Sequence, residues 1–240
     1  MVLCDGGPGL SDNLGPVAEM VDDLAQVHRY DQRGSGRSRS HGPFDVASFV
    51  ADLDALRRHW GHERWLVGGH SWGANLALCY ALTHPDRTTG VLYMAGSGLR
   101  SEGRDAARRR RLARLTEAER DELATADPER FLQLMWTTDF ADRRQVRLPL
   151  YQWPRDENIY RAVNESFEAY GLEEKVRRLA VPLMVIHGAH DEPARAREVA
   201  ELAPHGRYHE LERSAHVPWL EEPARLRELL RTFIREPLGT

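Results

Sequence analysis

The sequence predicts an α/β protein with a mostly parallel, doubly wound sheet and a helical insertion. Two observations carry this prediction. Short apolar runs alternate with stretches of helical periodicity, as in proteins whose parallel strands are joined by crossover helices. One long interval, residues 99–179, has helix-like periodicity interrupted by prolines and no convincing strand pattern. We therefore expect a sheet core formed by residues 1–98 and 180–240, with residues 99–179 laid over it as a cap.

The elements expected in the core follow in order along the chain. The apolar runs interpreted as strands lie at residues 1–4, 27–30, 65–68, 91–95, 181–187 and 208–211. The stretches interpreted as helices lie at residues 17–24, 46–60, 74–83, 194–202 and 218–234. The carboxyl ends of parallel strands meet at one edge of a sheet, so a substrate is expected at that edge, beneath the cap.

The composition is that of a globular protein with a sizeable core: 240 residues, 41% hydrophobic and 29% charged. The net charge of −4 does not indicate nucleic-acid binding, and the basic run at 108–111 lies among acidic residues, as on a solvated helix face. Cys4 and Cys79 both fall in apolar segments, which favours buried thiols over a disulfide. No apolar run reaches the roughly 18 residues that a membrane helix needs. We expect a cytoplasmic protein without nucleic-acid or membrane partners.

The candidate nucleophile is Ser71, in the run Gly69-His70-Ser71-Trp72-Gly73 between a predicted strand and an apolar helix. A serine on such a tight strand-to-helix turn projects its hydroxyl above the sheet. The turn leaves no room for side chains on either side, which explains Gly69 and Gly73. The N-terminus of the following helix favours negative charge that develops nearby. The pattern therefore predicts a nucleophilic serine.

A serine hydroxyl needs a base to take its proton, and the base needs an acid to orient it. In this architecture the acid and the histidine follow the serine along the chain, each in a loop after a strand. Asp191 follows the strand at 181–187, with Glu192 beside it as a competitor, and His216 follows the strand at 208–211. We expect Asp191 and His216 to form a catalytic triad with Ser71.

Other histidines lie near these residues but fit the role of base less well. His70 flanks the serine but is expected to point away from it, as the second residue of the five-residue turn. His187, His190 and Asp191 resemble part of a metal site, but a third convincing ligand and a His-Glu-x-x-His run are both missing from the sequence. We expect neither a metal ion nor an organic cofactor.

A tetrahedral intermediate of acyl transfer needs backbone donors for its oxyanion. The N–H of Trp72, directly after the nucleophile, is one candidate. The loop after the first strand, Cys4-Asp5-Gly6-Gly7-Pro8-Gly9, is expected to supply the other, because its glycines permit a close backbone approach. A generic turn would explain the glycines equally well, but not their position relative to Ser71.

Three motifs occur in the first half of the chain: Gly-Gly-Pro-Gly at 6–9, Tyr-Asp-Gln-Arg-Gly-Ser-Gly-Arg-Ser at 30–38, and Gly-His-Ser-Trp-Gly-Ala-Asn-Leu-Ala-Leu at 69–78. With His-Pro-Asp-Arg at 84–87 and the His-x-Pro-Trp-x-Glu-x-Pro pattern that begins at His216, they resemble the proline iminopeptidase (prolyl aminopeptidase) branch of the α/β-hydrolases. The resemblance covers roughly residues 2–98 and 181–234.

The resemblance implies an α/β-hydrolase fold with a cap that shapes specificity. It also implies roles for particular residues: Ser71, Asp191 and His216 in catalysis, and Gly7 and Trp72 as oxyanion donors. Residues 31–38 are interpreted as a mainly structural wall beside the site.

The chain departs from that family in three places. Family members usually have histidine before the Gly-Gly-Pro-Gly, whereas this chain has Asp5, and a carboxylate there disfavours an oxyanion unless it is paired or protonated. The family holds a substrate's amino group with acidic cap residues, for which Glu165, Glu168 and Glu173 are candidates without a specific match. The fold normally has two strands before the one at 1–4. We therefore expect a form extended upstream to be more stable and more active, because the extension would cover an exposed sheet edge.

These observations predict a serine hydrolase that cleaves an acyl bond through an acyl-enzyme. The expected substrates are small peptides or amides with a free N-terminus, proline first. One alternative is an esterase or lactonase acting on small hydrophobic esters. The other is a protein of the same fold that binds a ligand without turnover, or an inactive truncated form.

Overall fold

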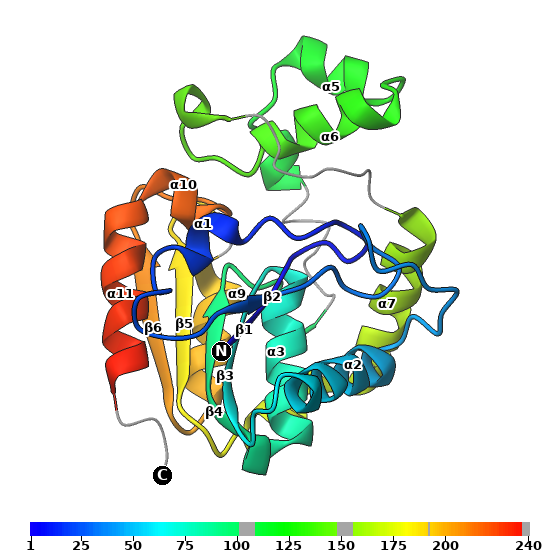
Figure 1. The fold of residues 1–240 in the computed structure, drawn as a ribbon. Coiled ribbons are helices and arrows are strands. Elements are labelled where there is room, and N and C mark those ends of the chain that lie inside the picture. The colour runs from blue at the N-terminus through cyan, green and yellow to red at the C-terminus, as the bar shows by residue number, and fades with distance from the viewer. Residues whose placement is uncertain (101–108, 148–155, 192, 237–240) are drawn as a thin grey trace.

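The computed structural model describes residues 1–100, 109–147, 156–191 and 193–236 (Figure 1). They form one six-stranded sheet in the order β2-β1-β3-β4-β5-β6, and every pair of neighbouring strands is parallel. The strands are β1 (Val2–Cys4), β2 (His28–Arg29), β3 (Trp65–His70), β4 (Thr88–Met94), β5 (Leu183–Gly188) and β6 (Gly206–Leu211). The predicted mostly parallel sheet is confirmed, although β2 is shorter than the predicted strand at 27–30.

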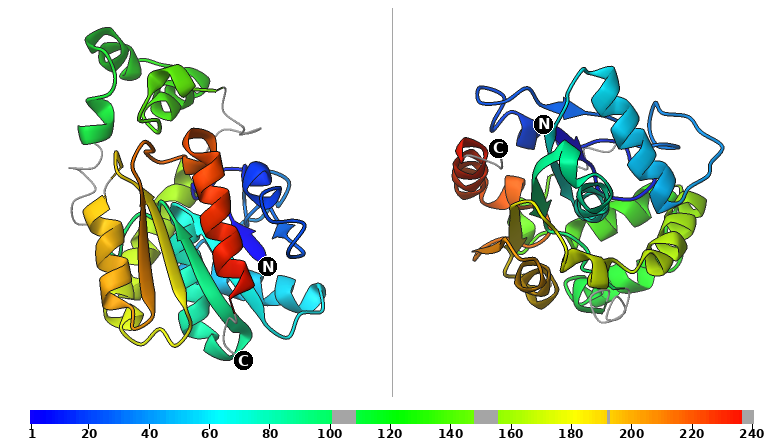
Figure 2. Two further views of the ribbon diagram at one scale, coloured as in Figure 1. Left: turned by 90° about the vertical axis from the view of Figure 1, so that its left-hand side faces the viewer. Right: turned by 90° about the horizontal axis from the view of Figure 1, so that it is seen from below.

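Helices cover both faces of the sheet, as Figure 2 shows from two directions. Outside the interval 99–179, they are α1 (Gly15–Ala18), α2 (Val46–His59), α3 (Trp72–Thr83), the 3₁₀ turn η1 (Pro85–Arg87), α9 (Pro193–Leu202), α10 (Pro218–Glu221) and α11 (Pro223–Arg235). Alternate residues of one strand point to opposite faces. In β4, Val91 and Tyr93 join the apolar cluster that includes residues of α2, α3 and α9, whereas Leu92 and Met94 join the cluster that includes residues of α1 and α11. This double layer is the doubly wound arrangement.

Two predicted helices differ from those observed. The helix expected at 218–234 is two helices, because Glu222 is not helical (φ −133°, ψ 58°) before Pro223 begins α11. Proline disfavours a helical conformation in the residue that precedes it, which accounts for the break. The helix expected at 17–24 is only the four-residue α1, and turns follow it.

The described residues between β4 and β5 form helices and no strand: α5 (Glu117–Leu123), α6 (Pro128–Thr137), η2 (Arg143–Gln145), α7 (Glu157–Tyr170) and α8 (Leu172–Val176). The last two helices pack on the core, since α7 contacts α2 and α8 contacts α3. The helices α5 and α6 stand apart from these layers, on the side of the molecule where α10 lies (Figure 1). None of the helices in the described ranges is both long and apolar enough to cross a bilayer.

Candidate active site

The turn between β3 and α3 holds Ser71 in a conformation that side-chain-bearing residues rarely adopt. Its φ is +55° and its ψ is −119°; Ala95 is the only other non-glycine residue with positive φ in the described ranges. A β-carbon on Gly69 would lie 2.1 Å from the Gly73 carbonyl oxygen, and one on Gly73 would lie 2.0 Å from the Cys4 carbonyl oxygen. Both glycines are therefore required by direct steric exclusion, and the strained serine stands where the sheet ends.

The loops after β5 and β6 bring an acid and a histidine together. His216 Nδ1 lies 2.7 Å from Asp191 Oδ2, although the two residues are 25 positions apart. The loops themselves touch, since a β-carbon on Gly188 would lie 2.2 Å from the Ala215 carbonyl oxygen. The His190 N–H also donates to the Ser214 carbonyl at 3.0 Å. The Asp–His pair is therefore held by the backbone of both loops as well as by its own hydrogen bond.

The electrostatics of this pair suit a carboxylate that orients a basic imidazole. Burial alone would raise the pKa of Asp191, but attraction to His216 and the hydrogen bond between them outweigh it and lower that pKa. Burial alone would lower the pKa of His216, but attraction to Asp191 outweighs it and raises that pKa above its ordinary value. The carboxyl is thus ionised at neutral pH, and the imidazole is a stronger base than an exposed histidine.

His70 makes a contact that the sequence did not predict. Its Nε2 lies 2.8 Å from the His216 carbonyl oxygen, and the two rings are 4.6 Å apart. Burial holds the pKa of His70 well below its ordinary range, so the ring is neutral, and the bond to a carbonyl requires the proton on Nε2. The residue before Ser71 is therefore hydrogen-bonded to the loop that carries His216.

Glu221 also holds the His216 loop, and the sequence reasoning missed this role. One carboxylate oxygen accepts the Ala215 N–H at 2.7 Å, and the other accepts the Ala141 N–H at 2.7 Å. The His216 N–H donates to the Asp139 carbonyl at 2.9 Å. Residues 139–141 lie between α6 and η2, so the predicted cap is tied directly to this loop. Glu221 belongs to the His-x-Pro-Trp-x-Glu pattern, which was the available signal.

The loop after β1 approaches Ser71 from the other side. A β-carbon on Gly6 would lie 3.2 Å from Ser71 Cβ, and Gly7 has φ +125°. Trp72 is the first residue of α3, so its N–H has no partner within the helix. Asp5 is 1% exposed. Burial, with a further contribution from Asp12, raises the pKa of Asp5 well above its ordinary range. Burial thus favours the protonated form of the Asp5 carboxyl, which lessens its repulsion of negative charge nearby.

Glu165 and Glu168 are both exposed on α7. The opposite face of that helix carries Phe167, whose ring packs against Trp72 with centroids 5.9 Å apart. Glu173 forms an ion pair with Arg100 at 3.1 Å. Glu192, the competitor of Asp191, lies outside the described residues.

His187 is buried, and its Nε2 lies 3.5 Å from Asp191 Oδ2. Burial lowers the pKa of His187, so its ring is neutral at neutral pH. Within the described ranges, no group of three or more histidine, cysteine, aspartate or glutamate side chains is arranged to hold a metal ion.

Residues 1–223 match the model of the α/β-hydrolase fold family, so the chain belongs to that family. Within it, the chain is similar to proline iminopeptidases. It is 41% identical to the proline iminopeptidase of Xylella fastidiosa over 92 residues. These aligned residues make up 37% of this chain and 29% of that protein. The chain thus matches less than a third of that relative's length. This similarity confirms the predicted resemblance.

Solved structures agree with the family assignment over nearly the whole chain. The crystal structure of VinJ has a TM-score of 0.75 and 28% identity, and covers 99% of this chain and 90% of VinJ. The crystal structure of the proline iminopeptidase of Mycobacterium smegmatis has a TM-score of 0.69 and 22% identity, and covers 98% of this chain and 88% of that one. At that lower identity, the likeness concerns the fold.

Proposed function

We propose that this protein is a serine hydrolase in which Ser71 is the nucleophile, His216 the general base and Asp191 the residue that orients it. One observation carries the proposal: a partly buried Asp191–His216 hydrogen bond of 2.7 Å, at the edge of the sheet where Ser71 stands on its strained turn. Gly7 and Trp72 are the proposed oxyanion donors. The proposed reaction needs no metal or cofactor.

In this mechanism the Ser71 oxygen attacks the substrate carbonyl while His216 takes the hydroxyl proton. Negative charge moves to the carbonyl oxygen, where the N–H groups of Gly7 and Trp72 stabilise it. His216 then gives its proton to the leaving amine or alcohol, which leaves an acyl group on Ser71. Water, deprotonated by His216, attacks that acyl group and releases Ser71. Asp191 stays ionised throughout and keeps the accepting nitrogen of His216 toward the serine.

An organofluorophosphonate tests the nucleophile, because it reacts with activated serines. Wild-type protein is expected to be labelled stoichiometrically, and Ser71→Ala to be unlabelled while still folded. Labelling of another serine would refute Ser71 as the nucleophile, whereas no labelling of folded wild-type protein would support a binding protein without turnover.

The proposed substrates are small peptides or amides with a free amino terminus, proline first. The similarity to proline iminopeptidases supports this class. The test compares prolyl arylamide with its N-acetylated form, which cannot carry the ammonium charge. An aminopeptidase is expected to hydrolyse the free form much faster, whereas equal rates would contradict the proposal.

A second candidate is an esterase or lactonase for small hydrophobic esters. The exposed positions of Glu165 and Glu168 favour it, because an aminopeptidase needs acidic groups facing the substrate. The double variant Glu165→Gln, Glu168→Gln distinguishes the candidates. A raised KM for prolyl arylamide, with ester hydrolysis unchanged, would assign these residues to the ammonium group. An unchanged KM would remove them from the site.

We further propose that residues 99–179 act as the cap that controls substrate access, and that the protein works in the cytoplasm. The contacts of residues 139–141 with the His216 loop support a cap that is coupled to the site. Replacement of residues 116–137 by a short linker is expected to alter substrate preference more than it alters fluorophosphonate labelling.

A further inference from the structure

The segment at 31–38 carries a buried amide that links two parts of the candidate site. Gln32 is 2% exposed. Its Nε2 donates to the Asp5 carbonyl oxygen at 2.7 Å, and its Oε1 accepts the Trp72 indole N–H at 2.9 Å. The amide N–H₂ of Gln32 therefore donates to the loop after β1, and its amide oxygen accepts from the first residue of α3.

Those two partners adjoin the proposed oxyanion donors. Asp5 directly precedes Gly6 and Gly7, and the Trp72 side chain belongs to the residue whose backbone N–H is the other donor. The segments are already in close contact, since a β-carbon on Gly73 would lie 2.4 Å from the Asp5 carbonyl oxygen. Gln32 spans this contact with hydrogen bonds on both sides.

The Trp72 end of the link is anchored in the core. Phe49 of α2 and Phe167 of α7 both meet the indole edge to face, with centroids 5.8 Å and 5.9 Å away. The Gln32 backbone is also held, because its carbonyl accepts the Ser35 N–H at 2.9 Å. The loop at 5–9 is thus the partner whose position depends on the Gln32 amide.

We propose that Gln32 is a positioning residue that sets the separation of the two oxyanion donors by tying the Asp5 carbonyl to the Trp72 indole. This inference rests on the proposed function for its catalytic consequence. Only an amide of this length supplies one donor and one acceptor at the two ends. Methionine fills the same volume but leaves both the Asp5 carbonyl and the Trp72 N–H without this partner.

The test uses Gln32→Met and Trp72→Phe, with Asn75→Leu as the matched control. Asn75 is also a buried amide bonded at both ends, to the Tyr93 hydroxyl and the Gly98 carbonyl, but it does not touch the loop at 5–9. Gln32→Met is expected to lower kcat by about 10- to 100-fold, with KM within about threefold of wild type, because misplaced donors weaken transition-state stabilisation. A boronic acid, which forms a tetrahedral adduct with the serine, should lose affinity by a similar factor. Asn75→Leu should lower the thermal midpoint while kcat stays within about threefold of wild type.

Trp72→Phe removes the indole N–H and also the five-membered ring that packs against Phe49 and Phe167, so a fall in kcat is expected together with a lower thermal midpoint. Added to Gln32→Met, it should cause little further loss, because both changes break one link. Unchanged kcat and boronate affinity in folded Gln32→Met would overturn the inference, as would a similar loss of kcat in Asn75→Leu.

A second readout is independent of activity. If wild-type protein neither turns over nor reacts with the fluorophosphonate, the proposed function fails, but the link is still tested by amide hydrogen exchange. Faster exchange at residues 5–9 in Gln32→Met, but not in Asn75→Leu, supports the link. Equal exchange in the two variants overturns it.

Discussion

The carboxyl edge of the sheet and the helices α5 and α6 are held together by different kinds of contact. At the sheet edge, the loops after β1, β3, β5 and β6 meet through backbone atoms so close that one added carbon would collide. The side chains there are mostly buried, and several hydrogen bonds run to backbone groups. Little can change at this edge without moving the candidate catalytic groups.

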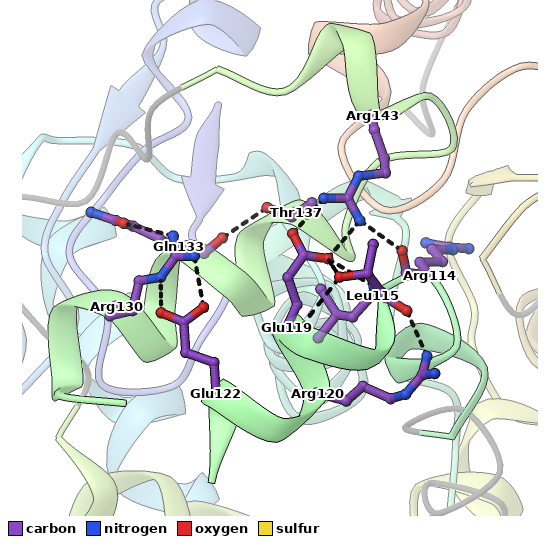
Figure 3. Close-up of polar contacts among 10 residues, drawn as sticks. Arg114, Leu115, Glu119, Arg120, Glu122, Arg130, Gln133, Thr137 and Arg143 are labelled. Carbon is purple, nitrogen blue, oxygen red and sulfur yellow. Dashed lines mark hydrogen bonds and ion pairs between the residues drawn. The ribbon is translucent and has the colours of Figure 1, made fainter. Parts of the chain in front are cut away.

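Figure 3 shows polar contacts around α5 and α6. Glu122 pairs with Arg130 at 2.7 Å, and Glu119 pairs with Arg143 at 2.6 Å. Thr116 and Glu119 form a capping box at the start of α5, and none of the residues of α5 is buried. Exposed ion pairs contribute little to the free energy of unfolding, so they can be replaced by others at a small cost in stability. The comparison teaches that close backbone packing fixes the sheet edge, whereas α5 and its neighbours are joined by exposed ion pairs that can change at small cost in stability.

The largest expected effect at the sheet edge is that of Asp191→Asn. The amide favours the wrong tautomer of His216, so kcat is expected to fall by about 10⁴-fold. Because Asp191 raises the pKa of His216, wild-type kcat/KM should fall as the pH drops through a value above about 6.5, where the imidazole becomes protonated. The residual activity of Asp191→Asn should fall at a lower pH. A mild effect on kcat would show that a carboxylate other than Asp191 orients His216.

Two glycine substitutions test whether close backbone packing at the sheet edge excludes a β-carbon. Gly73→Ala is expected to cost more than about 3 kcal/mol in urea unfolding, because its β-carbon would meet the Cys4 carbonyl at 2.0 Å. Gly171→Ala, between α7 and α8, has φ +65° but nothing within 4 Å of the new carbon, so it should cost about 1 kcal/mol. Similar costs for the two would contradict the steric account of the turn.

Glu221→Gln tests a side chain that joins the two regions. An amide keeps one acceptor but presents an N–H₂ group to a second backbone N–H, so a loss of about 1–3 kcal/mol in stability is expected. Loosening of the His216 loop should also lower kcat. The exposed Glu228→Gln on α11 serves as the control and should change neither quantity. Loss of stability without loss of kcat would show that the loop does not depend on Glu221 for its catalytic position.

The smallest effect is expected for Glu119→Gln, within about 1 kcal/mol, since the Glu119–Arg143 pair is partly exposed. The hydrogen bond from Arg143 is the main cause that lowers the pKa of Glu119 to about 2. Its contribution is therefore complete above the ordinary glutamate pKa and is lost as the pH falls toward 2. Thermal midpoints of wild type and variant should converge over that range. A gap that persists at acid pH would show that Glu119 acts by something other than its charge.

Much of the core could be predicted because its elements obey local rules. The strands are short apolar runs, and the turn at Ser71 needs glycines at two fixed positions. The break between α10 and α11 was missed although Pro223 signals it, because the amphipathic pattern continues across the proline. The contact of His70 with the His216 carbonyl joins residues 146 positions apart, and no local pattern reports such a distance.

The sequence by itself determined the family, the parallel sheet and the candidate residues Ser71, Asp191 and His216. The family follows from the resemblance of several short motifs. The sheet and the candidate residues follow from periodicity, from steric limits at the Ser71 turn and from positions directly after predicted strands. Only the tertiary structure decided that burial raises the pKa of Asp5, that Glu165 and Glu168 are exposed, and that Gln32 and Glu221 bridge separate segments. Burial, and therefore charge state, depends on which distant segments cover a group, and a bridge exists only once both of its ends have been brought together by folding.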